Sequence, residues 1–135
     1  MITTRYQKIT IISSRRPRHD INVELQWFGN SLGLFNLRDK DKSCFRIFIE
    51  LLKSTKIKKP LSSDEIADKL DLSRGTVMHH INKLLESGIV VIEDNKYILR
   101  VDNLEVLIDE LEKDIGRMLS ELRTVAKDID KHLAL

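Results

Sequence analysis

The sequence predicts an α+β fold in which two short helices and a β-hairpin fill the middle of the chain and a long helix follows them. Three observations support this fold: capping residues precede two amphipathic stretches, β-branched residues follow Gly88, and apolar residues recur in heptads after residue 102. The chain has 135 residues, of which 41% are hydrophobic, enough for one modest core with appended segments. We expect segment boundaries at 1–38, 39–101 and 102–135.

Two consecutive helices are predicted between residues 61 and 88. Ser62 stands three residues before Glu65, which is the spacing of a capping box, and an apolar stripe follows. Ser73 can cap a second helix, and Gly88 can end it because glycine tolerates the left-handed conformation found after helices. The two helices are therefore separated only by a tight turn.

A short hairpin is predicted directly after the second helix. Residues 89–92 and 97–101 are rich in β-formers, and they flank the turn-forming pair Asp94 and Asn95. Helix, turn, helix and hairpin in this order predict a winged helix-turn-helix, and this fold points to DNA.

The second helix has one polar face once Val77, Ile81 and Leu84 are assigned to the core. A recognition helix enters the major groove with its N-terminal residues against base edges, and Arg74 and Lys83 are expected to supply the charge-assisted contacts. The expected DNA-binding set in this region comprises Ser73, Arg74, Thr76, His79, Asn82, Lys83 and, in the hairpin, Lys96.

The pattern LSRGTVMHHINKLLESGIV resembles winged-helix transcriptional regulators of the ArsR and MarR type, small archaeal members in particular, over about residues 40 to 100. The resemblance implies that residues 73–83 read DNA and that residues 93–96 form the wing tip. His80 matches a family histidine, and its place beside the core stripe favours a partly buried, hydrogen-bonded side chain over a ligand. The wing is short, and the thiolate-rich motif of the metal-sensing members is absent.

An N-terminal β-hairpin extension is predicted ahead of the first core helix. Strand-like alternation is seen at Ile21, Val23, Leu25 and Trp27, and less cleanly at Ile9 and Ile11. The apical loop of this hairpin would carry three arginines that we expect to contact phosphates, namely Arg15, Arg16 and Arg18. Residues 29–33 then predict a turn or hinge, and Asp41 or Ser43 can start a helix that runs through Lys53.

A long coiled-coil-like helix is predicted from residue 102 to 135. Its apolar residues alternate by four and three positions, and we expect them to form a dimer seam: Leu104, Ile108, Leu111, Ile115, Met118, Leu122, Val125 and Ile129. Apolar residues at the flanking e positions, Leu119, Ala126 and Leu133, widen this face beyond a simple seam. Packing of the helix onto its own domain is therefore the alternative to dimerisation.

Composition argues against enzymes, metalloproteins and membrane proteins. The single cysteine, Cys44, lies in an apolar pattern that favours burial, and the four histidines do not form an i, i+4 metal pair. We find no glycine-rich phosphate loop, nucleophile elbow or distinct carboxylate pair, so neither catalysis nor a cofactor is expected. No apolar run approaches the roughly 18 residues of a membrane span, and no signal-peptide pattern is present, which predicts a cytoplasmic, nucleoid-associated protein.

Charge is distributed unevenly along the chain. Residues 1–100 hold 18 Lys and Arg against 12 Asp and Glu, a net charge of +6, whereas residues 101–135 hold 5 against 9, a net charge of −4. A second basic cluster is formed by Lys53, Lys56, Lys58 and Lys59. A basic body and an acidic tail suit DNA binding by the body.

The sequence therefore predicts a homodimeric, sequence-specific regulator of transcription that binds double-stranded DNA and acts most simply as a repressor. Its expected partners are DNA and a second copy of the chain, with no membrane partner. Two alternatives remain open: a winged-helix adaptor that docks onto the transcription or replication machinery, and a chromatin protein that binds DNA without sequence preference. The operator and any effector are not encoded in a recognisable motif.

Overall fold

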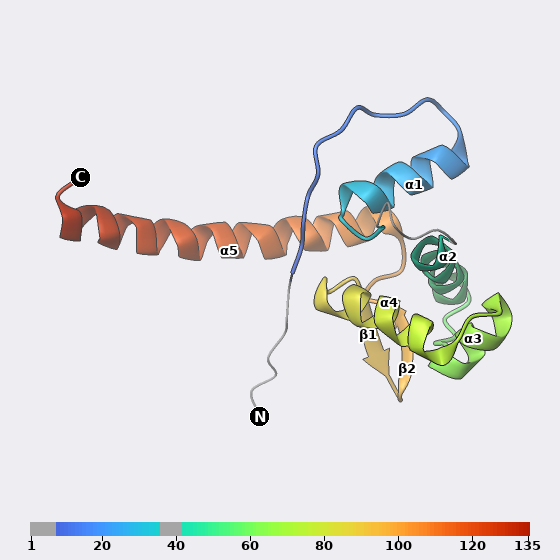
Figure 1. Ribbon diagram of the computed structural model, residues 1–135. Coiled ribbons are helices and arrows are strands. Elements are labelled where there is room, and N and C mark those ends of the chain that lie inside the picture. Colours follow the sequence, from blue (N-terminus) through green and yellow to red (C-terminus); the bar gives the residue numbers. More distant parts are fainter. Residues whose placement is uncertain (1–7, 36–41) are drawn as a thin grey trace. The chain divides into compact units, whose positions relative to one another are not determined.

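The computed structural model describes residues 8–35 and 42–135, and the chain divides into two compact units, Met1–Arg100 and Val101–Leu135. Among its described residues, the first unit contains four helices and a hairpin: α1 (Ile21–Ser31), α2 (Ser43–Lys56), α3 (Ser63–Leu70), α4 (Arg74–Glu86), β1 (Val90–Glu93) and β2 (Lys96–Leu99). The second unit contains α5 (Leu104–Leu133) (Figure 1). The order from α2 to β2 is that of a helix-turn-helix followed by a wing.

The core of the first unit lies where α2, α3, α4 and β2 meet, since α2 packs against each of the other three. Val77, Ile81 and Leu84 on α4 are all 0% exposed, which confirms the predicted core stripe. Cys44 is buried as expected, and its thiol donates a hydrogen bond to the Leu34 carbonyl at 3.1 Å. The remaining fully buried large side chains of α2 and α3 are Ile47, Phe48, Leu51 and Ile66.

Both predicted helix starts are confirmed by their capping bonds. The Ser62 hydroxyl oxygen accepts from the Glu65 N–H at 3.1 Å, and the Ser73 hydroxyl oxygen accepts from the Thr76 N–H at 3.1 Å. Each bond satisfies an N–H group that the helix itself leaves without a partner, and this typically contributes about 1 kcal/mol. Gly88 follows α4 with φ +78°, so the helix ends where the sequence predicts.

The wing is a tight antiparallel hairpin in which Val90 pairs with Leu99 and Glu93 with Lys96. Asp94 and Asn95 form its two-residue turn with φ of 51° and 66°, the positive values that a type I′ turn requires at both central positions. Reciprocal backbone bonds join Leu61 to Tyr97, at 2.9 and 2.7 Å. The hairpin is thereby fixed to the segment that leads into α3.

The predicted N-terminal β-hairpin is wrong, because residues 21–31 form helix α1. The Asp20 carboxylate accepts from the N–H groups of Asn22 and Val23 at 3.0 and 3.4 Å, which caps the helix. Ile21 and Val23 are 69% and 48% exposed, so the apolar alternation does not mark a buried strand face. Residues 8–20, including Ile9 and Ile11, form no strand.

Two further boundaries differ from the prediction. Helix α2 begins at Ser43 and runs to Lys56, one turn beyond Lys53, whereas Asp41 lies outside the described residues. The turn predicted at residues 29–33 is confirmed only at its end, where Gly33 lies in a turn with φ +68°. Gly29 lies inside α1, and a Cβ at this position would overlap the Phe35 ring. Packing against an aromatic ring, rather than backbone freedom, therefore accounts for this glycine.

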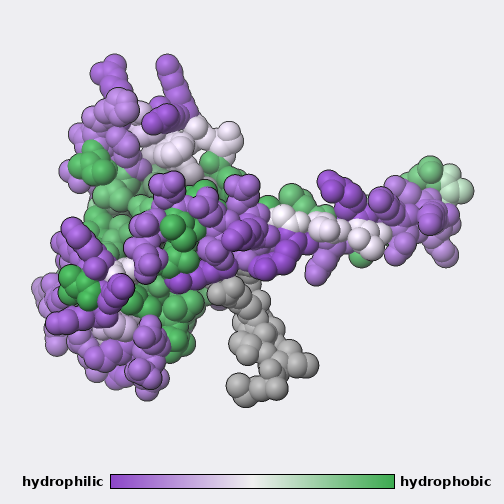
Figure 2. Space-filling view, turned by 180° about the vertical axis from the view of Figure 1, so that it is seen from behind, coloured by the Kyte–Doolittle hydropathy of each residue, from purple (hydrophilic) through white to green (hydrophobic). Residues whose placement is uncertain are grey.

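Helix α5 is the predicted long C-terminal helix, and its 30 residues span about 45 Å. Asn103 caps it by accepting from the Val106 N–H at 2.9 Å. Hydrophilic side chains cover most of the face of this helix seen in Figure 2, and hydrophobic ones show along its edges. Within residues 8–35 and 42–135, no helix combines the length and apolar character that crossing a membrane requires.

Candidate nucleic-acid interface

The outward face of α4 is a strip of four exposed residues, Gly75, His79, Asn82 and Glu86, at i, i+4, i+7 and i+11. This strip lies opposite the buried stripe of Val77, Ile81 and Leu84 because each residue advances about 100° around the helix. His79 and Asn82, two of the predicted DNA-binding residues, therefore share one face. Thr76 and Lys83 lie on one flank of the strip and are half-buried.

Gly75 has no packing role in the described fold. A Cβ at this position would meet nothing within 4 Å, and the residue has ordinary helical geometry rather than a positive φ. Glycine at an exposed helical position costs about 0.5–1 kcal/mol relative to alanine. The strip thus begins with a residue that leaves room for close approach from outside.

The start of α4 is fixed by a pair of hydroxyl groups. The Ser73 hydroxyl donates to the Thr76 hydroxyl oxygen at 2.8 Å, while its own oxygen caps the helix. Ser73 and Thr76 were both expected to contact DNA, and the structure brings them together with each other. Their first role is therefore to position the N-terminal turn of α4.

Two predicted cationic contacts are paired with carboxylates on the first turn of α3. Arg74 Nε lies 3.7 Å from Asp64 Oδ1, and Lys96 Nζ lies 3.3 Å from Glu65 Oε1. The Arg74 and Asp64 side chains are more than 70% exposed, and Lys96 and Glu65 are nearly half exposed. Exposed ion pairs contribute only about 0–1 kcal/mol, so phosphate groups can displace these carboxylates at little cost.

Glu65 connects the wing to the helix-turn-helix. Lys96 and the Ser62 hydroxyl hold the pKa of its carboxyl below the ordinary value, with Lys96 as the larger cause. Tyr97 adds a second connection, since its hydroxyl lies 3.8 Å from the sulfur of Met78 on α4. The wing is thus positioned relative to both helices.

Arg74 and Lys83 are not brought together. Nine residues separate them on α4, which places them roughly 180° apart around the helix and about 13.5 Å apart along it. Lys83 lines a small hollow of about 100 Å³ together with Lys8, Thr10, Gly33 and Glu86. The two cations therefore flank the exposed strip at opposite ends and on opposite sides.

The three arginines of the N-terminal segment lie outside regular secondary structure. Arg15, Arg16 and Arg18 are exposed, and among the described residues none forms an ion pair. The extended segment that carries them is tied down at two points, since the Lys8 N–H donates to the Glu86 carbonyl and the Ile12 N–H donates to the Ser31 carbonyl, both at 2.8 Å. These arginines therefore lie on an extended segment that is anchored at Lys8 and Ile12, and not at the tip of a hairpin.

Sequence reasoning missed the acidic partners, Asp64 and Glu65. Glu65 was recognised only as a capping residue, although it also pairs with a lysine 31 positions away. Local sequence carries no signal for such a pair, because it depends on the docking of the wing against α3. His80 is half-buried beside the core stripe, as expected.

Comparison with known families identifies the central part of the first unit. Residues 41–93 match the family model of a helix-turn-helix domain. The central part of the chain is thus similar to a helix-turn-helix domain. In helix-turn-helix domains that bind DNA, the second helix lies in the major groove, and α4 has the corresponding position in the order of elements. Comparisons with curated proteins and with solved structures gave no match.

Proposed function

We propose that the chain is a transcriptional regulator of the ArsR/MarR-like winged-helix type, which binds double-stranded DNA sequence-specifically as a homodimer. The observation that carries this proposal is the exposed strip of α4, which begins at Gly75 and continues through His79 and Asn82. Such a strip presents hydrogen-bonding side chains to base edges, and its glycine permits close approach of the helix to the groove floor.

Arg74 and Lys96 complete the interface by contacting phosphates on either side of the strip. Each faces a carboxylate of α3, at 3.7 and 3.3 Å respectively, and a phosphate group can replace this weakly bound, exposed partner. Exchanging a carboxylate for a phosphate releases condensed counterions from the duplex, which makes the exchange favourable at low salt. Base reading and phosphate anchoring are then divided between different residues.

Helix α5 supplies the dimer contact in this proposal. Four seam residues in its second half are between 37% and 64% exposed: Met118, Leu122, Val125 and Ile129. Each fully buried side chain of this size typically contributes about 1.5–3 kcal/mol, which favours covering the seam with a second copy. A bound dimer would occlude a promoter without any further part, so repression is the regulatory direction we propose.

The proposal is tested by selecting bound sequences from a random duplex library with the full-length protein. We expect enrichment of an inverted repeat whose half-sites lie one helical turn, or a multiple of it, apart. Fluorescence anisotropy should then show that log affinity falls linearly with log salt concentration. Absence of duplex binding at low salt would favour an adaptor, and equal binding of random DNA would favour a chromatin protein.

Single substitutions separate the two kinds of contact. Arg74→Ala should weaken all duplexes similarly, whereas Asn82→Ala should lose about 1–3 kcal/mol on the selected site and far less on random DNA. Lys127→Ala on α5 is the control, because Lys127 is exposed and lies outside the interface. Equal losses in Arg74→Ala and Lys127→Ala, with no loss in Asn82→Ala, would show that only overall charge matters.

A further inference from the structure

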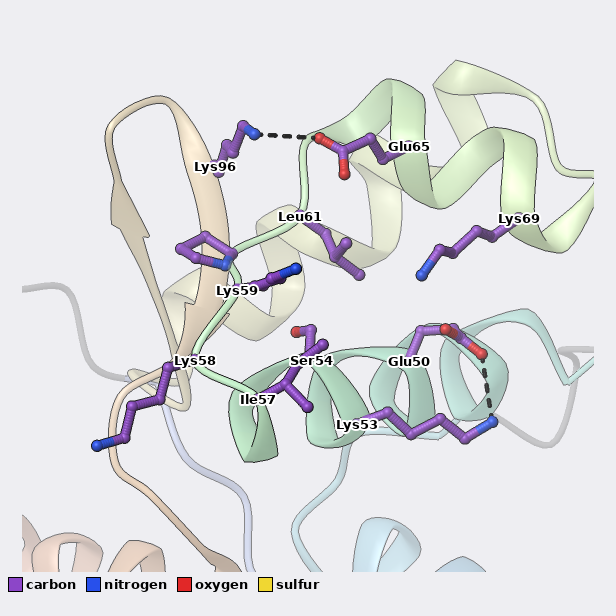
Figure 3. A pocket seen from close by; sticks show the side chains of 11 residues that line it. Glu50, Lys53, Ser54, Ile57, Lys58, Lys59, Leu61, Glu65, Lys69 and Lys96 are labelled. Atoms are coloured by element: carbon purple, nitrogen blue, oxygen red, sulfur yellow. Dashed lines mark ion pairs between the residues drawn. The ribbon is translucent and has the colours of Figure 1, made fainter.

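A hollow of about 540 Å³ lies on the first unit between the end of α2, one face of α3 and the wing strand β2 (Figure 3). We call it the lysine groove. Five lysines line it, namely Lys53, Lys58, Lys59, Lys69 and Lys96, together with two glutamates, Glu50 and Glu65. Its volume falls within the range of about 300–1,000 Å³ that is usual for small-molecule sites.

The positive charge of the lysine groove is only partly compensated. Glu50 is paired with Lys53 at 3.5 Å, and Glu65 is paired with Lys96 at 3.3 Å. Among the described residues, the other three lysines form no ion pair. Figure 3 shows the side chains of Lys59 and Lys69 directed toward each other, with Leu61 between their ends in this view, whereas Lys58 points away from them. Two lysines that form no ion pair among the described residues therefore line the same hollow.

The groove also has an apolar wall, formed by Ile57, Pro60 and Leu61. Ile57 is 63% exposed, although it directly follows a helix whose other face is buried. A wall of this kind is costly to leave in water and favours a ligand with a nonpolar or planar part. The ammonium groups and the apolar wall together favour an anion that carries a nonpolar part over a small inorganic anion.

The walls of the groove are held in place by hydrogen bonds between elements. The Thr55 hydroxyl oxygen on α2 accepts from the Leu99 N–H on β2 at 3.2 Å, and the same hydroxyl donates to the Leu51 carbonyl at 2.7 Å. Leu61 and Tyr97 exchange two backbone bonds on the other side. The groove is therefore formed before any ligand binds, which limits the entropy lost on binding.

We propose that the lysine groove binds a small phosphate-bearing ligand of about nucleotide size. Lysine ammonium groups bind phosphate oxygens as point charges, and Lys59 and Lys69 can contact one phosphate group from two sides. The nonpolar part of the ligand would then lie against Ile57 and Pro60. A hollow with an apolar wall suits such a molecule better than a DNA backbone, which is convex and presents no nonpolar group at its phosphates.

Occupancy of the groove is coupled to DNA binding through Lys96, a step that rests on the proposed function. Lys96 lines the groove and is also one of the expected DNA contacts. A ligand phosphate that draws Lys96 away from Glu65 would withdraw it from the duplex, so ligand and DNA compete for the same ammonium group. Because coupling between sites is reciprocal, DNA must weaken ligand binding by the same factor.

The proposal is tested by titrating adenosine monophosphate into the isotope-labelled full-length protein, without DNA and at constant ionic strength. We expect saturable shifts of the amide resonances of Lys58, Lys59, Leu61 and Lys96 in NMR spectra, and much weaker shifts with adenosine. The double variant Lys59→Gln/Lys69→Gln should bind at least roughly tenfold more weakly. The matched control Lys42→Gln/Lys127→Gln removes the same charge outside the groove and should bind as the wild type does.

Shifts that do not saturate, or an equal loss in both double variants, would mean diffuse charge attraction and overturn the proposal. Failure of the nucleotide to bind, together with a smaller salt dependence of duplex binding in Lys59→Gln/Lys69→Gln, would identify the groove as a DNA-backbone contact instead. If the nucleotide raises the apparent Kd for duplex DNA no more than sodium chloride at the same ionic strength does, the proposed competition is overturned, but ligand binding is not. Ligand binding is measured without DNA, so it stands or falls separately from the proposed function.

Discussion

Replacing Gly75 by alanine separates what the fold requires from what the proposed DNA interface requires. Because a Cβ at Gly75 meets nothing within 4 Å, Gly75→Ala adds helix propensity without a clash inside the protein. The gain is about 0.5–1 kcal/mol in the free energy of unfolding, and this corresponds to a rise in Tm of roughly 2–8 °C for a unit of this size. Thermal unfolding followed by circular dichroism measures it.

The same methyl group should impair DNA binding if α4 enters the major groove at this position. Forcing an extra methyl into a closely packed interface costs about 1–3 kcal/mol, or roughly 5- to 150-fold in Kd. Gly116→Ala is the matched control, since Gly116 is also helical, exposed and free of neighbours within 4 Å, but lies on α5. A stabilised Gly75→Ala protein that binds the selected duplex as tightly as wild type would refute the placement of Gly75 against DNA.

Four further outcomes follow from the charges and exposed side chains. Asp64→Asn removes the carboxylate that Arg74 faces, so duplex affinity should rise by roughly two- to fivefold at low salt; unchanged anisotropy titrations would argue that Arg74 does not reach a phosphate. The lowered pKa of Glu65 stabilises the folded state at pH values above its ordinary pKa, and this contribution is lost as pH falls through the pKa of the folded state. In Glu65→Gln, the free energy of unfolding measured with denaturant should therefore fall less steeply as the pH is lowered. Leu122→Asp should yield monomers in sedimentation experiments because it places a charge in the seam. The control Ser120→Asp lies on the opposite side of α5 and should leave a dimer. Wild-type protein that is monomeric at micromolar concentration would contradict the dimer proposal. Neutralising Arg15, Arg16 and Arg18 together should flatten the slope of log affinity against log salt by up to roughly 0.9 per lost contact, and an unchanged slope would leave these residues as solvated surface.

The elements that sequence predicted well are those whose signals are local. Ser62 and Ser73 each cap the helix that follows them, and Asp94 and Asn95 adopt the positive φ values that their turn needs. These features depend on residues within three or four positions of one another. Their outcome therefore changes little with the rest of the fold.

Helix α1 was mispredicted because two patterns competed in the same stretch. The alternation from Ile21 to Trp27 satisfies a strand, but Asp20 supplies a cap, and the residues that follow have no obstacle to a helix. Ile21 and Val23 remain exposed, so these two apolar positions do not contribute the buried face that a strand would need. The Asp20 cap and the packing of Gly29 against Phe35 both favour the helix.

The candidate site was predictable on α4 and unpredictable around it. The buried stripe determines which residues of α4 face outward, so His79 and Asn82 follow from the spacing of Val77 and Ile81. The neutralising carboxylates and the lysine groove arise where the α2 end, α3 and β2 come together from positions up to 46 residues apart. Only the folded arrangement of these elements reveals them.

The small size of the wing limits how much information one domain can read. Its two-residue turn carries Asp94 beside Glu93, against a single cation at Lys96, so the charge of the tip disfavours entry into the minor groove. In the proposed interface, base reading is left to the few outward side chains of α4, which would reach about four base pairs. A DNA sequence of about that length occurs by chance every few hundred base pairs in any genome. One domain with this interface therefore cannot distinguish an operator from the rest of the genome. Sequence selectivity would require a second DNA-binding domain at a fixed spacing on the same DNA.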